Sequence, residues 1–339
     1  MKVRLVCYED VNGWILGKIA RRLCEHLQLL NVRSDVAETP DPTADINHHI
    51  IYSQYDGEKT TCDTVMITHI DMEWKRKKLK HQLIMAEMGI CMSADTVQRL
   101  ASVGLSRVKL CYVNPPHDGV MRPRKIIIGI TSKVQPTGCK REFMLVQLAD
   151  RIVLNDYVFK IMGSQWEPVV NQLTQKGIEV EYYKEFDYDK YAQLIRSLDY
   201  YLYLGQDEGS MGFLDALAAG VPTIVTPQGF HLDAPGGITH AFNEVDELKE
   251  IFGKISENRN RLIRAVNCWT WPEYARKHLL IWKYLLDRNG GSVYPECFPE
   301  TLTPELEKLG VVVTMAPPRS YKQLLKRRLQ DLAWRYLFP

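Results

Sequence analysis

The chain has 339 residues, of which 45% are hydrophobic and 25% charged, and its formal net charge is +2 at pH 7. These values are ordinary for a globular protein and give no electrostatic reason to expect a nucleic-acid partner. The length suits two domains with a core each. There is no run of 18 apolar residues, no signal-like start and no Cys-x-x-Cys pair, so we expect a cytoplasmic protein with reduced cysteines.

Strand-like and helix-like patterns alternate along most of the chain. Strands are predicted at residues 3–8, 49–53, 64–68, 89–92 and 108–113, and helices at 14–30, 75–88 and 94–103. Residues 114–124 hold three prolines and a glycine, which indicates an interdomain linker, although a long surface loop would look the same. The alternation restarts with strands at 125–131, 159–162, 179–183, 200–204 and 222–225, and helices at 141–149, 167–176, 188–198 and 212–219.

This pattern predicts an α/β fold of two Rossmann-like domains, each built on a parallel sheet. We place the N-terminal domain at residues 1–116 and the C-terminal domain at 124–287. A C-terminal extension covers residues 288–339, of which 289–318 carry no interpretable pattern.

The turn after residue 204 is the richest candidate site. It reads Leu-Gly-Gln-Asp-Glu-Gly-Ser-Met-Gly-Phe-Leu-Asp over residues 204–215. Open parallel sheets bind ligands beyond the carboxyl ends of their strands, and the N–H groups at a helix start suit a phosphate. We expect a phosphate site on the backbone of the turn and a ribose contact one helical turn later, at Gly209, Ser210, Met211, Gly212 and Asp215. An ordinary strand–turn–helix capped by Asp207 or Ser210 would show the same pattern.

The same segment resembles the signature of retaining GT-B glycosyltransferases of the family 4 type, in which Glu-Gly-Phe-Gly leads to Glu-Ala-x-Ala-x-Gly-x-Pro. Residues 215–222 match the second half as Asp-Ala-Leu-Ala-Ala-Gly-Val-Pro. The first half departs, so its acid is Asp207 by spacing or Glu208 by the local Glu-Gly pair. The resemblance implies that this first acid contacts the donor sugar and that Asp215 holds the ribose. It also implies two Rossmann-like domains whose sheets face each other across a cleft, here with an additional C-terminal helix.

Residues 125–143 resemble the first strand and loop of the family's C-terminal domain, where an Arg and a Lys contact the donor diphosphate. The usual Gly-Arg is absent because Ile130 follows Gly129. The substitutes are Lys133 for the Arg and Lys140 or Arg141 for the Lys, unless these are solvated loop cations. Residues 182–191 are expected to line the base pocket. Residues 271–274 resemble the start of the family's closing helix, which returns toward the N-terminal domain.

Two positions of the N-terminal domain are further candidates. Gly13 is the only glycine of the turn 10–14, which makes a weak phosphate loop, and the resemblance implies that this turn faces the donor phosphates and the acceptor. His69 follows a predicted strand, where the resemblance implies a histidine close to the sugar. A structural histidine is the alternative for His69.

Two other patterns suggest metal sites but are better explained by local structure. Asp187 and Asp189 match the Asp-x-Asp of metal-dependent glycosyltransferases, yet they precede a predicted helix, so capping is favoured. His48 and His49 are neighbours on a predicted strand and should point to opposite faces. We therefore expect no metal and no cofactor other than the donor substrate.

The last 21 residues form a basic pattern. Residues 319–339 hold six Lys or Arg against one Asp, and Tyr321, Leu325, Leu329, Leu332 and Tyr336 fall on one helical stripe. Such a helix could lie on an anionic membrane at the inner face, or it could pack on the N-terminal domain.

Taken together, these patterns predict a glycosyltransferase that moves a sugar from a nucleotide-diphosphate sugar to a glycan or lipid-linked acceptor, such as those of polysaccharide biosynthesis. The resemblance implies a hexosyltransferase-type reaction with retention and without metal. A nucleotide-sugar 2-epimerase and a non-catalytic nucleotide- or glycan-binding subunit are the alternatives.

Overall fold

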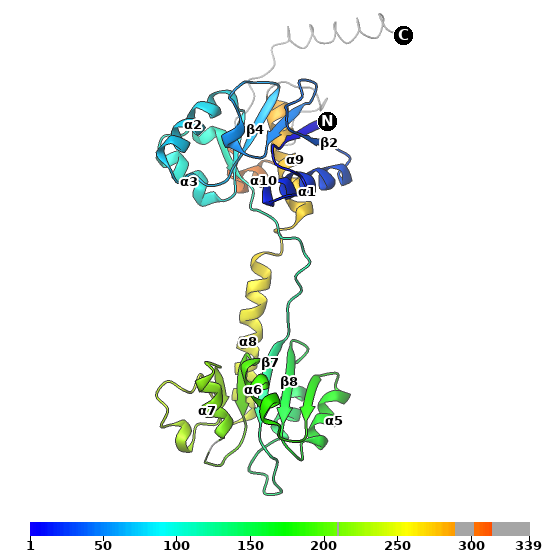
Figure 1. The fold of residues 1–339 in the computed structure, drawn as a ribbon, viewed down its shortest axis with the longest axis vertical. Helices are drawn as coiled ribbons and strands as arrows, with labels where there is room; N and C mark the ends of the chain where they lie inside the picture. Colours follow the sequence, from blue (N-terminus) through cyan, green and yellow to red (C-terminus); the bar gives the residue numbers. More distant parts are fainter. Residues whose placement is uncertain (209, 289–301, 314–339) are drawn as a thin grey trace, which may run out of the picture. The chain divides into compact units, whose positions relative to one another are not determined.

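The computed structural model describes residues 1–208, 210–288 and 302–313. The described chain divides into two compact units (Figure 1). Unit 1 holds Met1–Val120 and the described residues from Asn267 onward, and unit 2 holds Met121–Val266. The first boundary between the units therefore falls inside the predicted linker.

Unit 1 contains one six-stranded sheet whose neighbouring strands are all parallel. Its order is β2 (Arg33–Ala37), β1 (Lys2–Val6), β3 (Ile46–His49), β4 (Cys62–Ile67), β5 (Met88–Cys91) and β6 (Leu110–Tyr112). Parallel strands need crossover connections, and three of these are the helices α1 (Ile15–Leu29), α2 (Glu73–Met85) and α3 (Ala94–Ser102). Two single-turn 3₁₀ helices, Tyr52–Gln54 and Arg107–Lys109, lie in the loops.

Two strands of unit 1 differ from the sequence prediction. β2 was not predicted, because its sequence Arg-Ser-Asp-Val-Ala has no apolar face and the strand lies at the edge of the sheet. β3 ends at His49, where a strand was expected to begin, because its buried run contains Asn47, His48 and His49. His48 contacts Thr64 whereas His49 packs against Tyr55, which agrees with the prediction that the two rings point to opposite faces.

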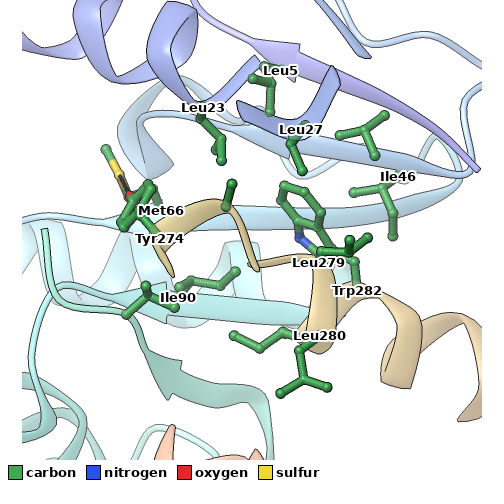
Figure 2. Packing of buried hydrophobic residues seen from close by; sticks show 14 of the residues in the cluster. Leu5, Leu23, Leu27, Ile46, Met66, Ile90, Tyr274, Leu279, Leu280 and Trp282 are labelled. Atoms are coloured by element: carbon green, nitrogen blue, oxygen red, sulfur yellow. Dashed lines mark hydrogen bonds between the residues drawn. The ribbon is translucent and has the colours of Figure 1, made fainter. Parts of the chain in front are cut away.

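The core of unit 1 is completed by a helix from the far end of the described chain, α9 (Trp271–Arg288). Figure 2 shows Tyr274, Leu279, Leu280 and Trp282 of α9 among side chains of the sheet and of α1. Those partners are Leu5, Leu23, Leu27, Ile46, Met66 and Ile90. The sequence-based boundary assigns this helix to the C-terminal domain at 124–287. That boundary is corrected, because α9 buries its apolar side chains against β1, β3, β4 and α1 of unit 1.

A short helix, α10 (Thr303–Lys308), also belongs to unit 1. Leu306 is fully buried in the core, and the backbone N–H of Tyr112 donates to the carbonyl of Leu309 at 2.9 Å. This helix lies in the stretch 289–318, for which the sequence suggested no structure. The predicted basic helix within 319–339 lies outside the described residues.

Unit 2 contains a second parallel six-stranded sheet. Its order is β9 (Glu179–Tyr183), β8 (Tyr157–Met162), β7 (Ile126–Thr131), β10 (Tyr200–Tyr203), β11 (Thr223–Val225) and β12 (His240–Ala241). The chain builds outward from β7 to β9 and then returns to the other side of β7 with β10. The order of strands therefore reverses between β7 and β10, which is the point where open α/β sheets bind ligands.

Helices cover both faces of the unit 2 sheet. One apolar cluster joins the sheet to α4 (Met144–Arg151), α5 (Glu167–Gln175) and α8 (Val245–Ala265), and another joins it to α6 (Tyr188–Arg196) and α7 (Met211–Ala218). α8 and β12 were not predicted. The two parallel sheets with their helices confirm the expected α/β class with two Rossmann-like units. The interdomain cleft stays a prediction.

None of the helices in the described ranges combines the length and hydropathy that a membrane crossing requires.

Candidate functional site

A cavity of about 630 Å³ opens at the carboxyl ends of β7, β8 and β9 in unit 2. We call it the switch-point cavity, because it lies beside the reversal of strand order. Its wall is formed by the ends of β7 and β8, the segment after β9, and the start of α6 and α7 (Thr131, Ser132, Lys133, Met162, Gly163, Ser164, Lys184, Glu185, Phe186, Tyr188, Tyr191, Ser210, Met211, Gly212, Asp215). The predicted lining segment 182–191 thus contributes residues 184–186, 188 and 191.

The start of α7 is held tightly against β7 and β10. The Ser210 hydroxyl bonds the Tyr201 hydroxyl at 2.6 Å, and the Tyr201 hydroxyl bonds Thr131 Oγ1 at 3.0 Å. A Cβ at Gly212 would lie 2.2 Å from Thr131 Oγ1 and 2.4 Å from the Tyr201 hydroxyl. Only glycine fits at position 212, because both neighbours are fixed by hydrogen bonds.

The amides of this turn do not all remain available. Ser210 N–H already donates to His231 Nε2 at 3.3 Å. The N–H groups of Met211 and Gly212 make no hydrogen bond to the described residues, as expected in the first turn of a helix. Gly209 lies outside the described residues. Two of the four predicted amides therefore remain as donors beside the cavity.

Asp215 lies on the cavity wall, one turn into α7. Its Oδ2 accepts a hydrogen bond from the Tyr191 hydroxyl at 2.5 Å. The Tyr191 ring packs against Phe186, with centroids 5.3 Å apart. Burial, and then the bond to the carboxylate, raise the pKa of Tyr191, so the phenol keeps its proton near neutral pH.

Of the three cations predicted to meet a diphosphate, Lys133 lines the cavity. It is exposed, and its ammonium makes no ion pair within the described ranges. Lys140 instead forms an ion pair with Asp207, and its ammonium donates to the Tyr203 hydroxyl oxygen at 2.8 Å. Neither Lys140 nor Asp207 lines the switch-point cavity.

Asp207 accepts hydrogen bonds from both Lys140 and Tyr203, and the three residues form a cluster of their own. Burial works to raise the pKa of Asp207, but the hydrogen bonds from Lys140 and Tyr203 outweigh it and lower the pKa overall. Glu208, its neighbour in the chain, is exposed and makes no hydrogen bond or ion pair with described residues. Its carbonyl lies where a Cβ on Gly229 would clash, at 2.3 Å, which fixes the path of the turn.

The side chain of Arg141 makes its hydrogen bonds within the protein. Its guanidinium donates to the carbonyl of Leu204 at 2.7 Å, to the carbonyl of Asn243 at 2.5 Å and to Thr226 Oγ1. Its backbone has a φ of 48°, which is uncommon for a residue other than glycine. Arg141 therefore links the loop after β7 to the ends of β10 and β11, and its donors are directed at protein acceptors.

In unit 1, the turn containing Gly13 is held by hydrogen bonds to Asp10, a residue of the same turn. Gly13 N–H donates to the carbonyl of Asp10 at 2.9 Å, and Asn12 N–H donates to the Asp10 carboxylate at 2.9 Å. The glycine that the packing requires is Gly17, where a Cβ would lie 2.0 Å from the Asp10 carbonyl oxygen.

His69 is exposed just beyond the end of β4. It lines a cavity of about 430 Å³ together with Asp71, Arg76, Thr96 and Arg99. That cavity lies wholly in unit 1, so His69 and the residues of the switch-point cavity belong to different units.

Sequence reasoning missed His231 and the hydroxyls of Tyr201 and Tyr203. A lone histidine in a loop carries no periodic signal, and His231 meets Ser210 only because β10 and β11 are neighbours in the sheet. The alternating tyrosines of β10 offered the one usable hint. The helix-capping interpretation of the Asp-x-Asp pattern is confirmed, because the Asp187 side chain accepts the Lys190 N–H at 2.9 Å. Among the described residues no group of three metal-ligating side chains gathers.

No protein-family model matches the sequence, and no curated protein matches it. Solved structures that resemble it include the apo form of the lipopolysaccharide outer core galactosyltransferase WaaB, at 12% identity and a TM-score of 0.34, covering 81% of this chain and 97% of that one. HepE of Anabaena with UDP and glucose is similar at 11% identity and a TM-score of 0.33, covering 86% and 99%.

A UDP-N-acetylglucosamine 2-epimerase from Listeria monocytogenes, itself a provisional assignment, matches at 10% identity and a TM-score of 0.30, covering 88% of this chain and 99% of that one. Similarity at this level supports no conclusion about the activity of this chain.

Proposed function

We propose that this chain is a glycosyltransferase that binds a nucleotide-diphosphate sugar in the switch-point cavity and transfers the sugar to a glycan or lipid-linked acceptor. The observation that carries the proposal is the meeting of an acid, a free cation and two helix-start amides at the reversal of a parallel sheet. These are Asp215, Lys133, Met211 and Gly212. Such a set suits the ribose and the diphosphate of one ligand.

In this proposal each part of the donor has its own partners. The diphosphate lies at the start of α7, where the helix dipole and Lys133 compensate its charge. Asp215 accepts from the ribose, and the exposed rings of Phe186 and Tyr188 lie on the wall where a base could stack. The first acid of the motif is assigned to Glu208, because Asp207 is already bound by Lys140 and Tyr203.

The proposed reaction follows the resemblance to retaining, metal-independent enzymes. The bond between the sugar C1 and the diphosphate oxygen breaks, and a bond between C1 and an acceptor hydroxyl oxygen forms on the same face. The acceptor proton passes to the leaving phosphate oxygen. The protein's part is then to position the donor and stabilise the charge that develops on the diphosphate.

A second candidate is a non-catalytic nucleotide-binding subunit. This candidate is favoured because the side chains of Lys140 and Arg141 already donate to protein groups. Of the three predicted cations, Lys133 is the one that lines the cavity wall. A subunit of this kind would bind nucleotide without turning over a nucleotide sugar.

The test is a thermal-shift screen against UDP, GDP, ADP, CMP and deoxythymidine diphosphate, each with and without EDTA. A ligand at a hundred times its Kd adds about 2.7 kcal/mol to the free energy of unfolding, which raises the Tm by several degrees. We expect one nucleotide to do so regardless of EDTA, and expect Asp215→Ala to abolish the shift. Glu250→Gln, an exposed acid on α8, is the matched control and should keep it.

The outcomes separate the candidates. Binding followed by acceptor-dependent sugar transfer supports the transferase, and binding without turnover supports the subunit. No shift with any nucleotide at millimolar concentration would rule out both.

A further inference from the structure

Two side chains from neighbouring helices meet on the wall of the switch-point cavity. Tyr191 of α6 donates its hydroxyl proton to Oδ2 of Asp215 on α7, with an oxygen–oxygen distance of 2.5 Å. Both residues line the cavity. Nothing in the signature of residues 204–222 indicates Tyr191, which lies 24 residues before Asp215 in the chain.

The bond leaves two hydrogen-bond acceptors beside each other. Asp215 Oδ1 makes no hydrogen bond to any residue of the described ranges. The Tyr191 oxygen has given its proton to Asp215 and also has the Thr131 hydroxyl as a neighbour, so the lone pair that remains can only accept from a ligand. A ligand that matches this pair must present two neighbouring hydroxyl donors.

Both partners of the pair contact neighbouring side chains. The Phe186 ring packs against the Tyr191 ring, and Asp215 sits on a helix whose start is fixed by the hydroxyls of Ser210, Tyr201 and Thr131. Because Asp215 lies one turn after Met211 and Gly212, the two acceptors have a set spacing from the free amides of α7. In the proposed site, a diphosphate held by these amides would bring the attached ribose toward the pair.

We propose that Tyr191 is a specificity-determining residue that forms, together with Asp215, a paired acceptor for the cis-diol of a ribose. The site then takes ribonucleotides and discriminates against 2′-deoxyribonucleotides, including deoxythymidine diphosphate. This inference rests on the proposed nucleotide site. Its physical basis is that a deoxy ligand leaves one acceptor of the pair without a donor, and a site built to bond a hydroxyl strongly rejects the analogue that lacks it.

The experiment compares Kd values, by calorimetry on the full chain, for UDP, ADP, GDP and CDP and for the 2′-deoxy form of each. For the ribonucleotide that binds, we expect the wild-type protein to prefer it over its deoxy form by at least about tenfold. Tyr191→Phe keeps the ring but removes the hydroxyl. It should weaken ribonucleotide binding about tenfold, leave deoxynucleotide binding nearly unchanged, and so bring the ratio close to one.

Tyr200→Phe is the matched control. Tyr200 lies on β10 of the same unit, does not line the switch-point cavity, and its hydroxyl makes no hydrogen bond within the described residues. The ribose-to-deoxyribose ratio of Tyr200→Phe should equal that of the wild type. The Tm of each unliganded variant, compared with the wild type, reports any general loss of structure.

The possible failures are distinguishable. If a ribonucleotide binds and Tyr191→Phe keeps the wild-type ratio, the role of Tyr191 is wrong while the nucleotide site stands. Tighter binding of a deoxynucleotide than of its ribonucleotide by the wild type overturns the paired acceptor in the same way. If none of the eight ligands binds, the proposed function fails and this inference fails with it.

Discussion

The Nε2 atom of His231 accepts the backbone N–H of Ser210 at 3.3 Å, while its Nδ1 lies 3.0 Å from the carbonyl oxygen of Thr226. Because a carbonyl can only accept, the ring proton must be on Nδ1 and Nε2 must be the acceptor. The ring is fully buried against Phe213, with centroids 4.4 Å apart. His231 thus ties the loop after β11 to the start of α7, where we propose that a diphosphate binds.

His231→Ala should destabilise unit 2 and weaken nucleotide binding. The substitution removes a buried ring and two hydrogen bonds, which together cost about 2–4 kcal/mol of unfolding free energy. Urea unfolding monitored by fluorescence measures this loss of unfolding free energy. His240→Ala is the control, because His240 is half-buried and, among the described residues, its side chain has a ring contact with Tyr200 and no hydrogen bond. Equal losses in the two variants would contradict the role of His231.

Gly212→Ala should destabilise unit 2 by about 1–3 kcal/mol, because the added methyl group overlaps the fixed hydroxyls of Thr131 and Tyr201. The shift of α7 that relieves the overlap should also reduce nucleotide-induced stabilisation. Gly253→Ala is the opposite case. Gly253 lies within α8 with nothing near its missing Cβ, so alanine should stabilise the protein by about 0.5–1 kcal/mol. A stable Gly212→Ala variant would show that the turn is not packed as described.

The contrast between these two glycines shows what the sequence could and could not predict. Strand–helix alternation was enough to predict two Rossmann-like units, and the glycine-containing turn led us to propose a site at the start of α7. Packing partners were not predictable, because Arg141 meets Asn243 and Thr226 at separations of 102 and 85 residues. For the same reason α9 was assigned to the wrong unit: its apolar pattern predicts a buried helix but not the sheet that buries it.

The buried histidines of unit 1 should make its stability depend on pH. His48 and His278 lie with ring centroids 5.3 Å apart, and each has an Nε2 without a hydrogen-bond partner among the described residues. Burial is the main cause that lowers the pKa of His278 to about 4, and burial lowers the pKa of His48 as well. Both rings are therefore uncharged in the folded protein at neutral pH.

The sign follows from the unfolded chain, where a histidine has a pKa of about 6.5. Above that value the histidines are neutral in both the folded and the unfolded state, so their low pKa in the folded state costs no unfolding free energy. As the pH falls from about 6.5 toward 4, the unfolded state takes up protons that the folded state does not, so stability falls. His278 alone accounts for a loss on the order of 3 kcal/mol over this range.

His278→Leu tests this origin. The variant should be about as stable as the wild type at pH 8, because it removes a buried ring nitrogen that has no partner. Between pH 6.5 and 4, its unfolding free energy should fall less steeply, by about 1.4 kcal/mol per pH unit. The exposed His81→Leu should keep the wild-type slope. Identical slopes for the wild type and His278→Leu would show that other groups cause the acid sensitivity.

We expect the two neighbouring acids after β10 to have different roles. Asp207 should stabilise the fold, and Glu208 should contact the ligand. The Asp207 carboxylate accepts from Lys140 and Tyr203, and the Lys140 side chain is only 12% exposed. Asp207→Asn therefore leaves a largely buried ammonium without its counter-charge, at a cost of about 1–2 kcal/mol. Because the hydrogen bonds lower the pKa of Asp207, its contribution is present above the unfolded value near 4 and is lost as the pH falls below it.

Glu208→Gln should change the unfolding free energy by less than about 0.5 kcal/mol, because Glu208 is exposed and makes no hydrogen bond or ion pair with described residues. If Glu208 is the acid that meets the donor sugar, the same variant should lose sugar transfer while still binding the nucleoside diphosphate. Urea unfolding and transfer assays on both variants check this. A stable Asp207→Asn that loses transfer, beside a fully active Glu208→Gln, would reverse the assignment and make Asp207 the acid that contacts the sugar.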